Sequence, residues 1–383
     1  MTADVEFYLG LMMKSKKILI LTSYMSGNGG IERVTQRMND LLADEKGVDL
    51  TVVSLSGGDK NIGEDNKKPG FHRGKEEWLE PLKAYRFPFG FSSRLVNFFI
   101  HITYMFFFLL FRRFDYVICT GPAQALYLSK FKRFFRFRFE IFAWPHFSLT
   151  SGFGDFRLCK HADYCLGISK EICQQLEEIG VPKDRIILFP NPFERQPLVK
   201  PKTPNSGESH FVYIGRLIFE GQKRVKDIID ASLLVSGNFK VHLIGAGADY
   251  DIINDYVKTN GADEKIVIHE GWHANPWGVV ERPDVLLLSS SFEGLPTVLG
   301  EAMSRGIVCI SSDCKTGPRD FITDRENGYL YPVGDTAALA ASMQLIVNGE
   351  CAFEPAKISA AMEFYYTDSY IERFNRIFLN NSL

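Results

Sequence analysis

The chain has 383 residues, of which 45% are hydrophobic and 23% are charged, and its formal net charge at pH 7 is −2. This length exceeds what one hydrophobic core usually supports, so two domains are expected in a globular protein. The small negative charge argues against a general nucleic-acid binder, which carries a basic excess. The cysteines are odd in number, scattered and without a CxxC pair, which favours reduced thiols in a cytosolic protein over disulfides or zinc ligands.

Alternation of strands and helices starts with the apolar run KKILILTS (16–23), which is typical of a buried parallel strand. The loop YMSGNGG follows and leads into the amphipathic run IERVTQRMNDLLAD. Gly29 and Gly30 would let the backbone approach a ligand where a helix N-terminus favours negative charge; the alternative is a tight turn that requires positive φ. The loop does not match G-x-G-x-x-G, which argues against a Rossmann oxidoreductase.

The segment LVNFFIHITYMFFFLLF (95–111) is apolar and is flanked by Arg94, Arg112 and Arg113. Its length is at the lower limit for spanning a bilayer, and three of its residues are polar. We therefore expect a buried or membrane-facing helix within the first domain rather than a membrane span.

Further strands are expected at DLTVVSL, DYVICT, FEIFAW, ADYCLGIS and RIILFP. His146 follows one of them in FAWPHFS, at the strand end where open α/β sheets bind ligands. The alternative is a purely structural histidine.

The segment SKFKRFFRFRFE (129–140) interleaves five cations with phenylalanines. Such a pattern suits an anionic membrane surface, and it could also stack nucleic acid bases. A third interpretation is a buried strand whose cations reach solvent.

The pattern breaks near Pro190-Asn191-Pro192, and PLVKPKTPNSGES has the composition of a linker. It restarts with the strand HFVYIGR, the helix RVKDIIDASLLV, and the strands KVHLIGAG, KIVIHEGW, DVLLLSSS and IVCISSD. We predict a first domain over 1–195, a second over 205–365, and a helix over 366–383 that packs on either domain. Two successive βα domains predict two doubly wound sheets, with ligands at the carboxyl ends of the strands.

Two cations follow the first strand of the second domain. Arg216 stands directly after the strand, and Lys223 lies at the start of the next helix. A guanidinium fork and a point charge together suit a diphosphate, although solvated surface cations are equally compatible with the position. Trp272 lies in a later loop, GWHANPW, where it could stack on a base or close the domain surface.

The stretch SSFEGLPTVLGEAMSR (290–305) carries two acids, Glu293 on a loop and Glu301 in a helical run. Pro296 is expected to be the first helical residue, where its missing N–H costs nothing. Glu301 could accept hydrogen bonds from sugar hydroxyls, or it could simply stabilise the helix dipole. The start of this helix predicts an anion site beside Glu293, formed by Gly294, Leu295, Pro296, Thr297 and Val298.

The motifs GGIERV, WPHFSL, ISKEI, NPF, YIGRLIFEGQKRVKDIIDA and SFEGLPTVLGEAMSRGIVCISSDCKTGPRDFI occur in this order and resemble those of glycosyltransferase family four. The resemblance extends over nearly all of the chain from Lys16 onward. It implies the GT-B fold, with two Rossmann-like doubly wound domains that face each other across a cleft, and transfer of a hexose with retention of configuration. The motif sequences are closest to those of members that build the bacterial lipopolysaccharide outer core from UDP-galactose.

The resemblance also implies roles for the residues of the second domain. Glu293 would lie against the donor sugar, and Glu301 would hold the ribose hydroxyls. Arg216 and Lys223 would neutralise the diphosphate leaving group, helped by the amides from Leu295 to Val298.

For the first domain, the resemblance implies that Gly29 and Gly30 cap the phosphates and that His146 contacts the sugar near the reacting carbon. Members of this fold need no DxD metal site, and Asp249–Asp251 does not follow a diphosphate loop. We therefore expect neither a metal ion nor another cofactor, with the UDP-sugar as a substrate.

Three departures from the family pattern stand out. Many relatives have Lys-Gly at the position of Lys223-Arg224, which puts the geometry of the phosphate loop in doubt. Gly300 replaces a common leucine, and Asn191-Pro192-Phe193 replaces the commoner Asn-Gly.

The expected partners are a UDP-sugar and a glycolipid or polysaccharide acceptor, with no nucleic acid. Residues 95–113 and 130–139 are expected to bind an anionic membrane surface, so that the protein is cytoplasmic and peripherally attached to the inner face of the plasma membrane. The alternatives are transfer from UDP-glucose or UDP-N-acetylglucosamine in capsule or exopolysaccharide synthesis, and a non-catalytic sugar-binding module of the same fold. A sugar-nucleotide 2-epimerase shares the fold but needs different acids.

Overall fold

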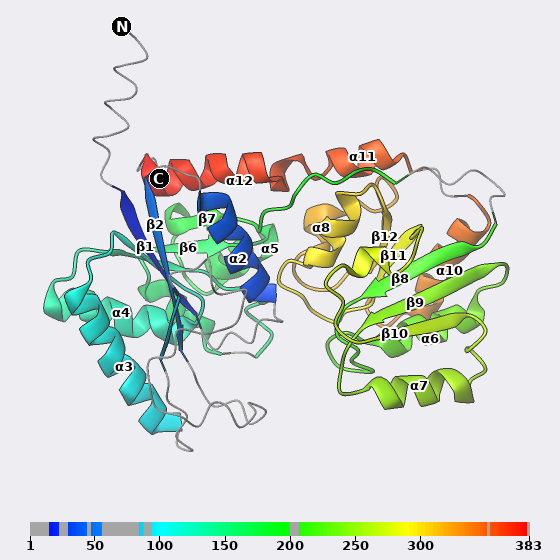
Figure 1. The fold of residues 1–383 in the computed structure, drawn as a ribbon, viewed down its shortest axis with the longest axis horizontal. Helices are drawn as coiled ribbons and strands as arrows, with labels where there is room; N and C mark the ends of the chain where they lie inside the picture. Colours follow the sequence, from blue (N-terminus) through cyan, green and yellow to red (C-terminus); the bar gives the residue numbers. More distant parts are fainter. Residues whose placement is uncertain are drawn as a thin grey trace, which may run out of the picture. The chain divides into compact units, whose positions relative to one another are not determined.

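A computed structural model of the protein describes residues 15–22, 30–43, 47–55, 84–87, 94–152, 154–199, 207–350 and 353–380. The chain forms two compact units, each built around one parallel sheet (Figure 1). The first unit consists of Met1–Ile168, Ile172–Pro192 and Tyr370–Leu383. The second consists of Ser169–Glu171 and Phe193–Ser369.

Seven parallel strands form the sheet of the first unit, in the order β3-β2-β1-β4-β5-β6-β7. Their bounds are β1 Lys16–Thr22, β2 Val48–Leu55, β3 Ala84–Phe87, β4 Tyr116–Cys119, β5 Glu140–Ala143, β6 Tyr164–Gly167 and β7 Ile186–Leu188. The strand order reverses between β1 and β4, as in a doubly wound fold. Strand β4 is buried along its whole length, which explains its continuous apolar sequence. The sequence pattern did not predict β3, because four residues are too few to show a period.

Four helices connect these strands: α2 Gly30–Ala43, α3 Arg94–Phe111, α4 Pro122–Phe135 and α5 Lys170–Glu178. Helix α4 begins with a proline, whose missing N–H is harmless in the first turn. It ends at Phe135, and the next residue, Arg136, adopts the left-handed conformation with φ 54°. The basic aromatic segment 129–140 is therefore a helix end and a loop that leads into β5, and its interpretation as a buried strand is wrong.

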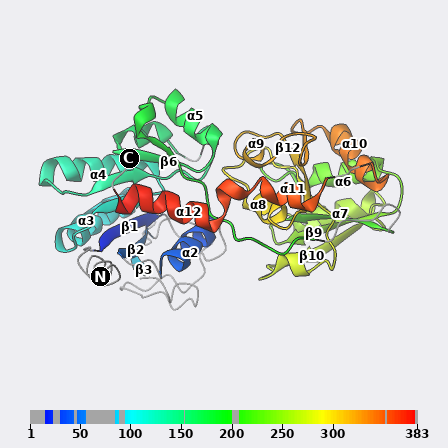
Figure 2. The same ribbon diagram turned by 90° about the horizontal axis from the view of Figure 1, so that it is seen from above.

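Helices α3 and α4 lie side by side in the first unit (Figures 1 and 2) and share a cluster of aromatic rings. The ring of Phe106 in α3 contacts those of Phe131 and Phe135 in α4, with centroids 5.6 and 4.5 Å apart. Much of the remaining apolar surface of both helices is exposed, at Val96, Phe98, Phe99, Phe107, Leu110, Phe111, Phe134 and Phe135. Among the helices that the structure describes, none is long and apolar enough to cross a bilayer.

The second unit has six parallel strands in the order β10-β9-β8-β11-β12-β13. Their bounds are β8 Ser209–Ile214, β9 Phe239–Gly245, β10 Ile266–Glu270, β11 Val285–Leu288, β12 Val308–Ser312 and β13 Tyr329–Tyr331. The strand order reverses between β8 and β11, so the exits of these two strands are the expected ligand site. The three-residue strand β13 was not predicted, for the same reason as β3.

The larger helices of the second unit are α6 Val225–Leu234, α7 Tyr250–Thr259, α8 Thr297–Met303 and α10 Thr336–Val347, with shorter helices α9 Pro318–Phe321 and α11 Pro355–Ala360. One face of the sheet packs on α6, α7 and α10 through a continuous apolar core. Phe211, Val241 and Leu287 of the sheet and Ile228 of α6 are fully or almost fully buried in it. This packing fixes the positions of the strand exits that carry the candidate site.

The C-terminal helix α12 Thr367–Phe374 continues as a π-helical segment, Asn375–Leu379, and adds to the core of the first unit. The ring of Phe378 lies 5.3 Å from that of Tyr116 and 5.0 Å from that of Phe142. Tyr370 is fully buried, and its ring centroid is 4.8 Å from that of Phe189. The core of the first unit thus contains Tyr370, Phe374 and Phe378 from the C-terminal segment.

The chain leaves the first unit at Pro192, and Phe193 already belongs to the second unit. The Phe193 amide donates to the Tyr365 carbonyl at 2.9 Å, and the Phe193 ring is fully buried. A Cβ atom at Gly300 in α8 would lie 2.4 Å from this ring. The glycine in place of leucine and the phenylalanine after the hinge therefore compensate for each other in volume.

Candidate functional site

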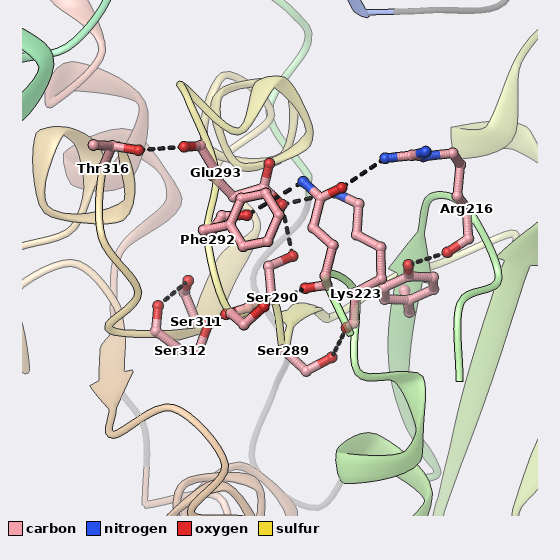
Figure 3. A network of polar contacts seen from close by, with 12 residues as sticks. Arg216, Lys223, Ser289, Ser290, Phe292, Glu293, Ser311, Ser312 and Thr316 are labelled. Carbon is pink, nitrogen blue, oxygen red and sulfur yellow. Dashed lines mark hydrogen bonds and ion pairs between the residues drawn. The ribbon is translucent and has the colours of Figure 1, made fainter. Parts of the chain in front are cut away.

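Three loops lie together at the carboxyl ends of β8, β11 and β12 (Figure 3). Ser291 of the middle loop donates its amide to the Gln222 carbonyl at 2.8 Å, which joins it to the loop after β8. Phe292 forms a parallel bridge with Lys315 of the loop after β12. Backbone pairing on both sides therefore fixes the loop that carries Glu293.

The carboxylate of Glu293 is bound from two sides. Lys223 Nζ donates to Glu293 Oε1 at 2.7 Å, and Ser290 Oγ donates to the same oxygen at 2.6 Å. The hydroxyl of Thr316 donates to the Glu293 carbonyl oxygen. Glu293 is only 8% exposed, so its acid is held in one orientation within a mostly buried ion pair.

Arg216 lies on the neighbouring loop, and its side chain points toward the loop of Phe292 (Figure 3). Its Nη2 donates to Gln222 Oε1 at 2.7 Å, and Gln222 Nε2 donates to the Phe292 carbonyl at 3.3 Å. The hydroxyl of Tyr213, a buried residue of β8, donates to the Arg216 carbonyl at 2.6 Å. The guanidinium is therefore oriented by a neutral amide rather than by an acid.

The backbone next to Arg216 packs closely against the loop after β9, where one position has no room for a side chain. The amide of Leu217 donates to the Ala246 carbonyl at 2.9 Å, and a Cβ atom at Gly247 would lie 2.0 Å from the Leu217 carbonyl oxygen. The GAG sequence after β9 thus has a structural role, since it lets two strand exits touch through their backbones.

Arg224 explains the departure from Lys-Gly after the candidate phosphate lysine. It precedes α6 with φ 49° and ψ 47°, a left-handed conformation that favours glycine. Its guanidinium binds the carboxylate of Asp227 through two hydrogen bonds of 2.7 and 3.0 Å. The chain thus keeps the backbone geometry of a glycine at this point and holds it with an ion pair.

Helix α8 begins at Thr297, and Pro296 is the residue before it, with φ −69° and ψ 98°. The expectation that Pro296 is the first helical residue is wrong by one position, because its ψ is extended. Leu295 is 6% exposed beside this helix start. A Cβ atom at Gly317 would lie 2.3 Å from Pro296 Cδ, so the loop after β12 closes tightly on Pro296 and on Gly294.

Glu301 lies just over one turn inside α8 and has a different partner from Glu293. The indole N–H of Trp277 donates to Glu301 Oε2 at 3.0 Å. Trp277 belongs to a short 3₁₀ turn, Pro276–Gly278, in the loop after β10. Trp272 of the same loop is 59% exposed.

His146 lies in the first unit, directly after β5, and is 8% exposed. Its ring centroid is 4.2 Å from that of the buried Trp144, and its Nε2 finds no hydrogen-bond partner among the described residues. Burial lowers the pKa of His146 to about 3, so the imidazole is neutral near pH 7. Gly30 is the first residue of α2, whereas Gly29 lies outside the described residues.

The structure brings Arg216, Lys223 and Glu293 into one hydrogen-bonded network, and it gives Glu301 a separate partner. Four contributors escaped sequence reasoning: Gln222, Ser290, Thr316 and the pairing of Trp277 with Glu301. The run of serines before Glu293 was a signal for the role of Ser290, since small polar residues at the end of a strand often bind neighbouring loops. Gln222 and Thr316 gave no distinct signal.

Two cations and a helix start at a strand-order reversal can bind an anion with two phosphate groups. The carboxylates of Glu293 and Glu301 can orient hydroxyl groups next to such an anion. In the part of the chain that the structure describes, no group of three His, Cys, Asp or Glu side chains is arranged to hold a metal ion.

Comparisons with known proteins show the family of the chain. The family described as "Glycosyl transferases group 1" matches residues 194–362 of the chain. A lipopolysaccharide 1,6-galactosyltransferase of Escherichia coli (strain K12) is 39% identical over 272 residues, which make up 70% of this chain and 75% of that protein. A protein of the same name from Salmonella typhimurium (strain LT2) is 37% identical over 265 residues, 68% of this chain and 73% of that protein. The solved structure of "lipopolysaccharide outer core galactosyltransferase WaaB apo form" is similar with a TM-score of 0.83 and 30% identity, covering 95% of this chain and 99% of that one.

Proposed function

The chain belongs to the group 1 glycosyltransferases, and we propose that it transfers a hexose, galactose from UDP-galactose, to a lipopolysaccharide core or a related cell-surface glycolipid. The identity of 39% and 37% to two lipopolysaccharide 1,6-galactosyltransferases supports this donor and this acceptor. The observation that carries the proposal is the Lys223–Glu293 ion pair beside Arg216, at the reversal of strand order.

In this proposal, Arg216 and Lys223 bind the diphosphate of the donor. Breaking the bond between the sugar and the phosphate places negative charge on UDP, and fixed cations stabilise this charge as it develops. The Lys223 ammonium has three N–H donors, and among the described residues only Glu293 takes one, which leaves two for phosphate oxygens. The N–H groups of Thr297 and Val298 at the start of α8 have no intrahelical partner, and together with the N–H group of Leu295 before the helix they add further donors.

We further propose the retaining chemistry of glycosyltransferase family four. The acceptor hydroxyl attacks the anomeric carbon on the face from which UDP leaves, and an oxygen of the leaving phosphate takes the hydroxyl proton. Glu293 orients the sugar and offsets positive charge at the anomeric carbon, without forming a bond to it. His146 contacts the sugar as a neutral hydrogen-bonding group, which its lowered pKa supports.

Further residues of the candidate site are proposed to contact the nucleotide part of the donor. Glu301 accepts hydrogen bonds from the ribose hydroxyls, and Trp272 lies against the nucleotide. Gly29 and Gly30 approach the phosphates from the first unit. We propose that no metal ion takes part, because Arg216 and Lys223 supply the positive charge that a divalent cation supplies in other transferases.

We propose that the acceptor is reached at an anionic membrane surface, on the cytoplasmic face of the plasma membrane. Helices α3 and α4 expose large apolar side chains, among them Phe111 at 80% and Phe134 at 73%. The same stretch of the chain carries exposed cations, at Arg112, Arg113, Lys130, Arg133, Arg136 and Arg138. The stretch from residue 94 to 139 contains a single acid, Asp115, although the whole chain carries a net charge of −2.

The test of the transferase is a product assay with the purified full chain, EDTA and a lipopolysaccharide core that lacks its outer galactose. We expect mass spectrometry to show one added hexose from UDP-galactose, and no addition with Glu293→Gln. The matched control is Asp230→Asn, which also removes the acid of an acid–lysine pair in the second unit, 2.5 Å from Lys226, and leaves transfer intact. Transfer from UDP-glucose or UDP-N-acetylglucosamine alone would replace the proposed donor, and no transfer from any donor would reject the function.

The membrane contact is tested by flotation with vesicles that contain phosphatidylglycerol. We expect binding that weakens in salt and is lost when Phe111 and Phe134 are changed to serine. The control changes two exposed apolar side chains of the second unit, Leu234 and Ile252, to serine. Equal flotation of both double variants would reject α3 and α4 as the binding surface.

A further inference from the structure

Trp277 is held on its edge by a residue of α8 and on its face by a residue of the turn that follows α8. Its indole N–H donates to Glu301 Oε2 at 3.0 Å. The guanidinium carbon of Arg305 lies 4.9 Å from the centroid of its rings, in cation–π contact. Glu301 and Arg305 are four positions apart, so the C-terminal end of α8 and the turn after it both contact the indole.

Arg305 is itself fixed. Its Nη1 donates to the Glu301 carbonyl at 2.8 Å, and its Nη2 donates to Gln196 Oε1 at 3.1 Å. The amide of Val199 donates to the Arg305 carbonyl at 2.8 Å. The guanidinium is therefore anchored to the segment 193–199, and it limits the positions that the indole can take.

The two acids of the candidate site thus have chemically different partners. Glu293 binds a lysine, so a counter-charge accompanies it. Glu301 binds a neutral N–H group, and no other described side chain bonds its carboxylate. A neutral donor fixes the plane of the carboxylate and leaves its negative charge available to other donors.

We infer that Trp277 is a positioning residue, which orients the Glu301 carboxylate so that its second oxygen accepts hydrogen bonds from the vicinal hydroxyls of a nucleotide ribose. The inference rests on the proposed role of Glu301 in the donor site. Trp277 makes no contact with the reacting atoms, and its effect passes through Glu301 alone. The ring also packs beside α8, so the test must separate the N–H group from the ring.

Two substitutions make this separation. Trp277→Phe keeps an aromatic ring under Arg305 and removes the donor. Trp277→His keeps a ring nitrogen, Nε2, at the same number of bonds from Cα as the indole nitrogen, and removes the second ring. Affinities for UDP and for 2′,3′-dideoxy-UDP are then measured by calorimetry with the full chain.

We expect wild-type protein to prefer UDP over 2′,3′-dideoxy-UDP by roughly tenfold to a hundredfold, the range of hydrogen bonds to a charged group. Trp277→Phe reduces this preference at least fivefold, whereas Trp277→His retains most of it, and both bind dideoxy-UDP as wild type does. The control Tyr256→Phe removes another neutral donor to a carboxylate, 2.9 Å from Asp230, and leaves the preference unchanged.

The outcomes distinguish the inference from the proposed function. If wild type and Glu301→Gln bind both nucleotides equally well, the ribose role of Glu301 fails, and the inference fails with it. If Glu301→Gln loses the preference but Trp277→Phe keeps it, the donor site stands and the inference is overturned. Equal losses in Trp277→Phe and Trp277→His would also overturn it, because ring packing alone would then explain the effect. Midpoints of thermal unfolding identify any variant whose fold has changed. If Trp277→Phe is such a variant, the affinities of Trp277→His alone decide.

Discussion

Lys223 Nζ lies 2.7 Å from Glu293 Oε1, although the two residues are 70 positions apart in the sequence. Their side chains are 16% and 10% exposed, so the ion pair is largely removed from water. Each charge then depends on the other for compensation. The acid next to the expected sugar position and the lysine next to the expected diphosphate therefore form one unit.

Removing either partner alone leaves a mostly buried charge without compensation. We expect Lys223→Met and Glu293→Gln each to lower the free energy of unfolding by about 3 kcal/mol and to abolish transfer. The double variant should lose less than the sum, with a coupling of about 1–3 kcal/mol in urea unfolding. The exposed pair of Lys357 and Glu354, 3.5 Å apart, is the control and should couple by less than about 0.5 kcal/mol. If the losses in free energy of unfolding for Lys223→Met and Glu293→Gln were additive in the double variant, the two charges would not depend on each other.

The left-handed conformation of Arg224 leads to a comparison of two replacements. Both Arg224→Gly and Arg224→Ala remove the ion pair with Asp227, but only glycine adopts φ 49° without strain. We expect the glycine variant to be more stable than the alanine variant by about 1 kcal/mol in urea unfolding. Equal stability of the two would mean that the backbone at this position is not strained.

The contact between Phe193 and Gly300 predicts a reciprocal rescue. Gly300→Leu introduces atoms where a Cβ already lies 2.4 Å from the Phe193 ring, and we expect a loss of about 2–3 kcal/mol. Phe193→Ala leaves a cavity and costs about 3–4 kcal/mol. The combination should cost clearly less than the sum, because leucine fills the space that phenylalanine leaves. Thermal unfolding of the four proteins measures this, and strictly additive costs would show that the two side chains do not share the space.

A row of three histidines predicts a dependence of stability on pH. The rings of His210, His242 and His269 are joined by hydrogen bonds of 3.1 Å across three strands. Burial, and to a smaller extent the neighbouring His269, His210 and Lys240, together lower the pKa of His242 to about 4. The folded state therefore binds fewer protons than the unfolded state between about pH 6.5 and pH 4, so this stabilisation is present above pH 6.5 and is lost as the pH falls toward 4.

The measurement is the midpoint of thermal unfolding of wild type and His242→Gln from pH 7 to pH 4. We expect the wild type to be the more stable at pH 7 and the difference to narrow as the pH falls. His161→Gln, at an exposed position of the first unit, controls for the loss of a histidine as such. A difference that stays constant or widens would contradict the assignment to His242.

Sequence periodicity was sufficient to predict several of the longer elements, but not the 14-residue helix α4. Strands β1, β8 and β9 and helices α2 and α6 lie where apolar runs and amphipathic segments predicted them, because buried parallel strands are continuously apolar. It was insufficient for β3 and β13, which have four and three residues.

The candidate site was predictable only in part, and for a physical reason. Charged residues directly after strands, such as Arg216 and Glu293, can be found from the strand pattern alone. The pairing of Lys223 with Glu293 and of Trp277 with Glu301 depends on strand order, which no local pattern contains.

The contacts of Phe378 with Tyr116 and Phe142 have a consequence for synthesis on the ribosome. Residues up to Pro192 emerge first, but the core of their unit is complete only when the segment from Tyr370 onward has been translated. The second unit is almost contiguous in sequence and has all of its residues by Ser369. The half of the protein that is made first is therefore the last to finish folding, and a truncated chain that ends at the hinge would expose the apolar surface that Phe378 covers.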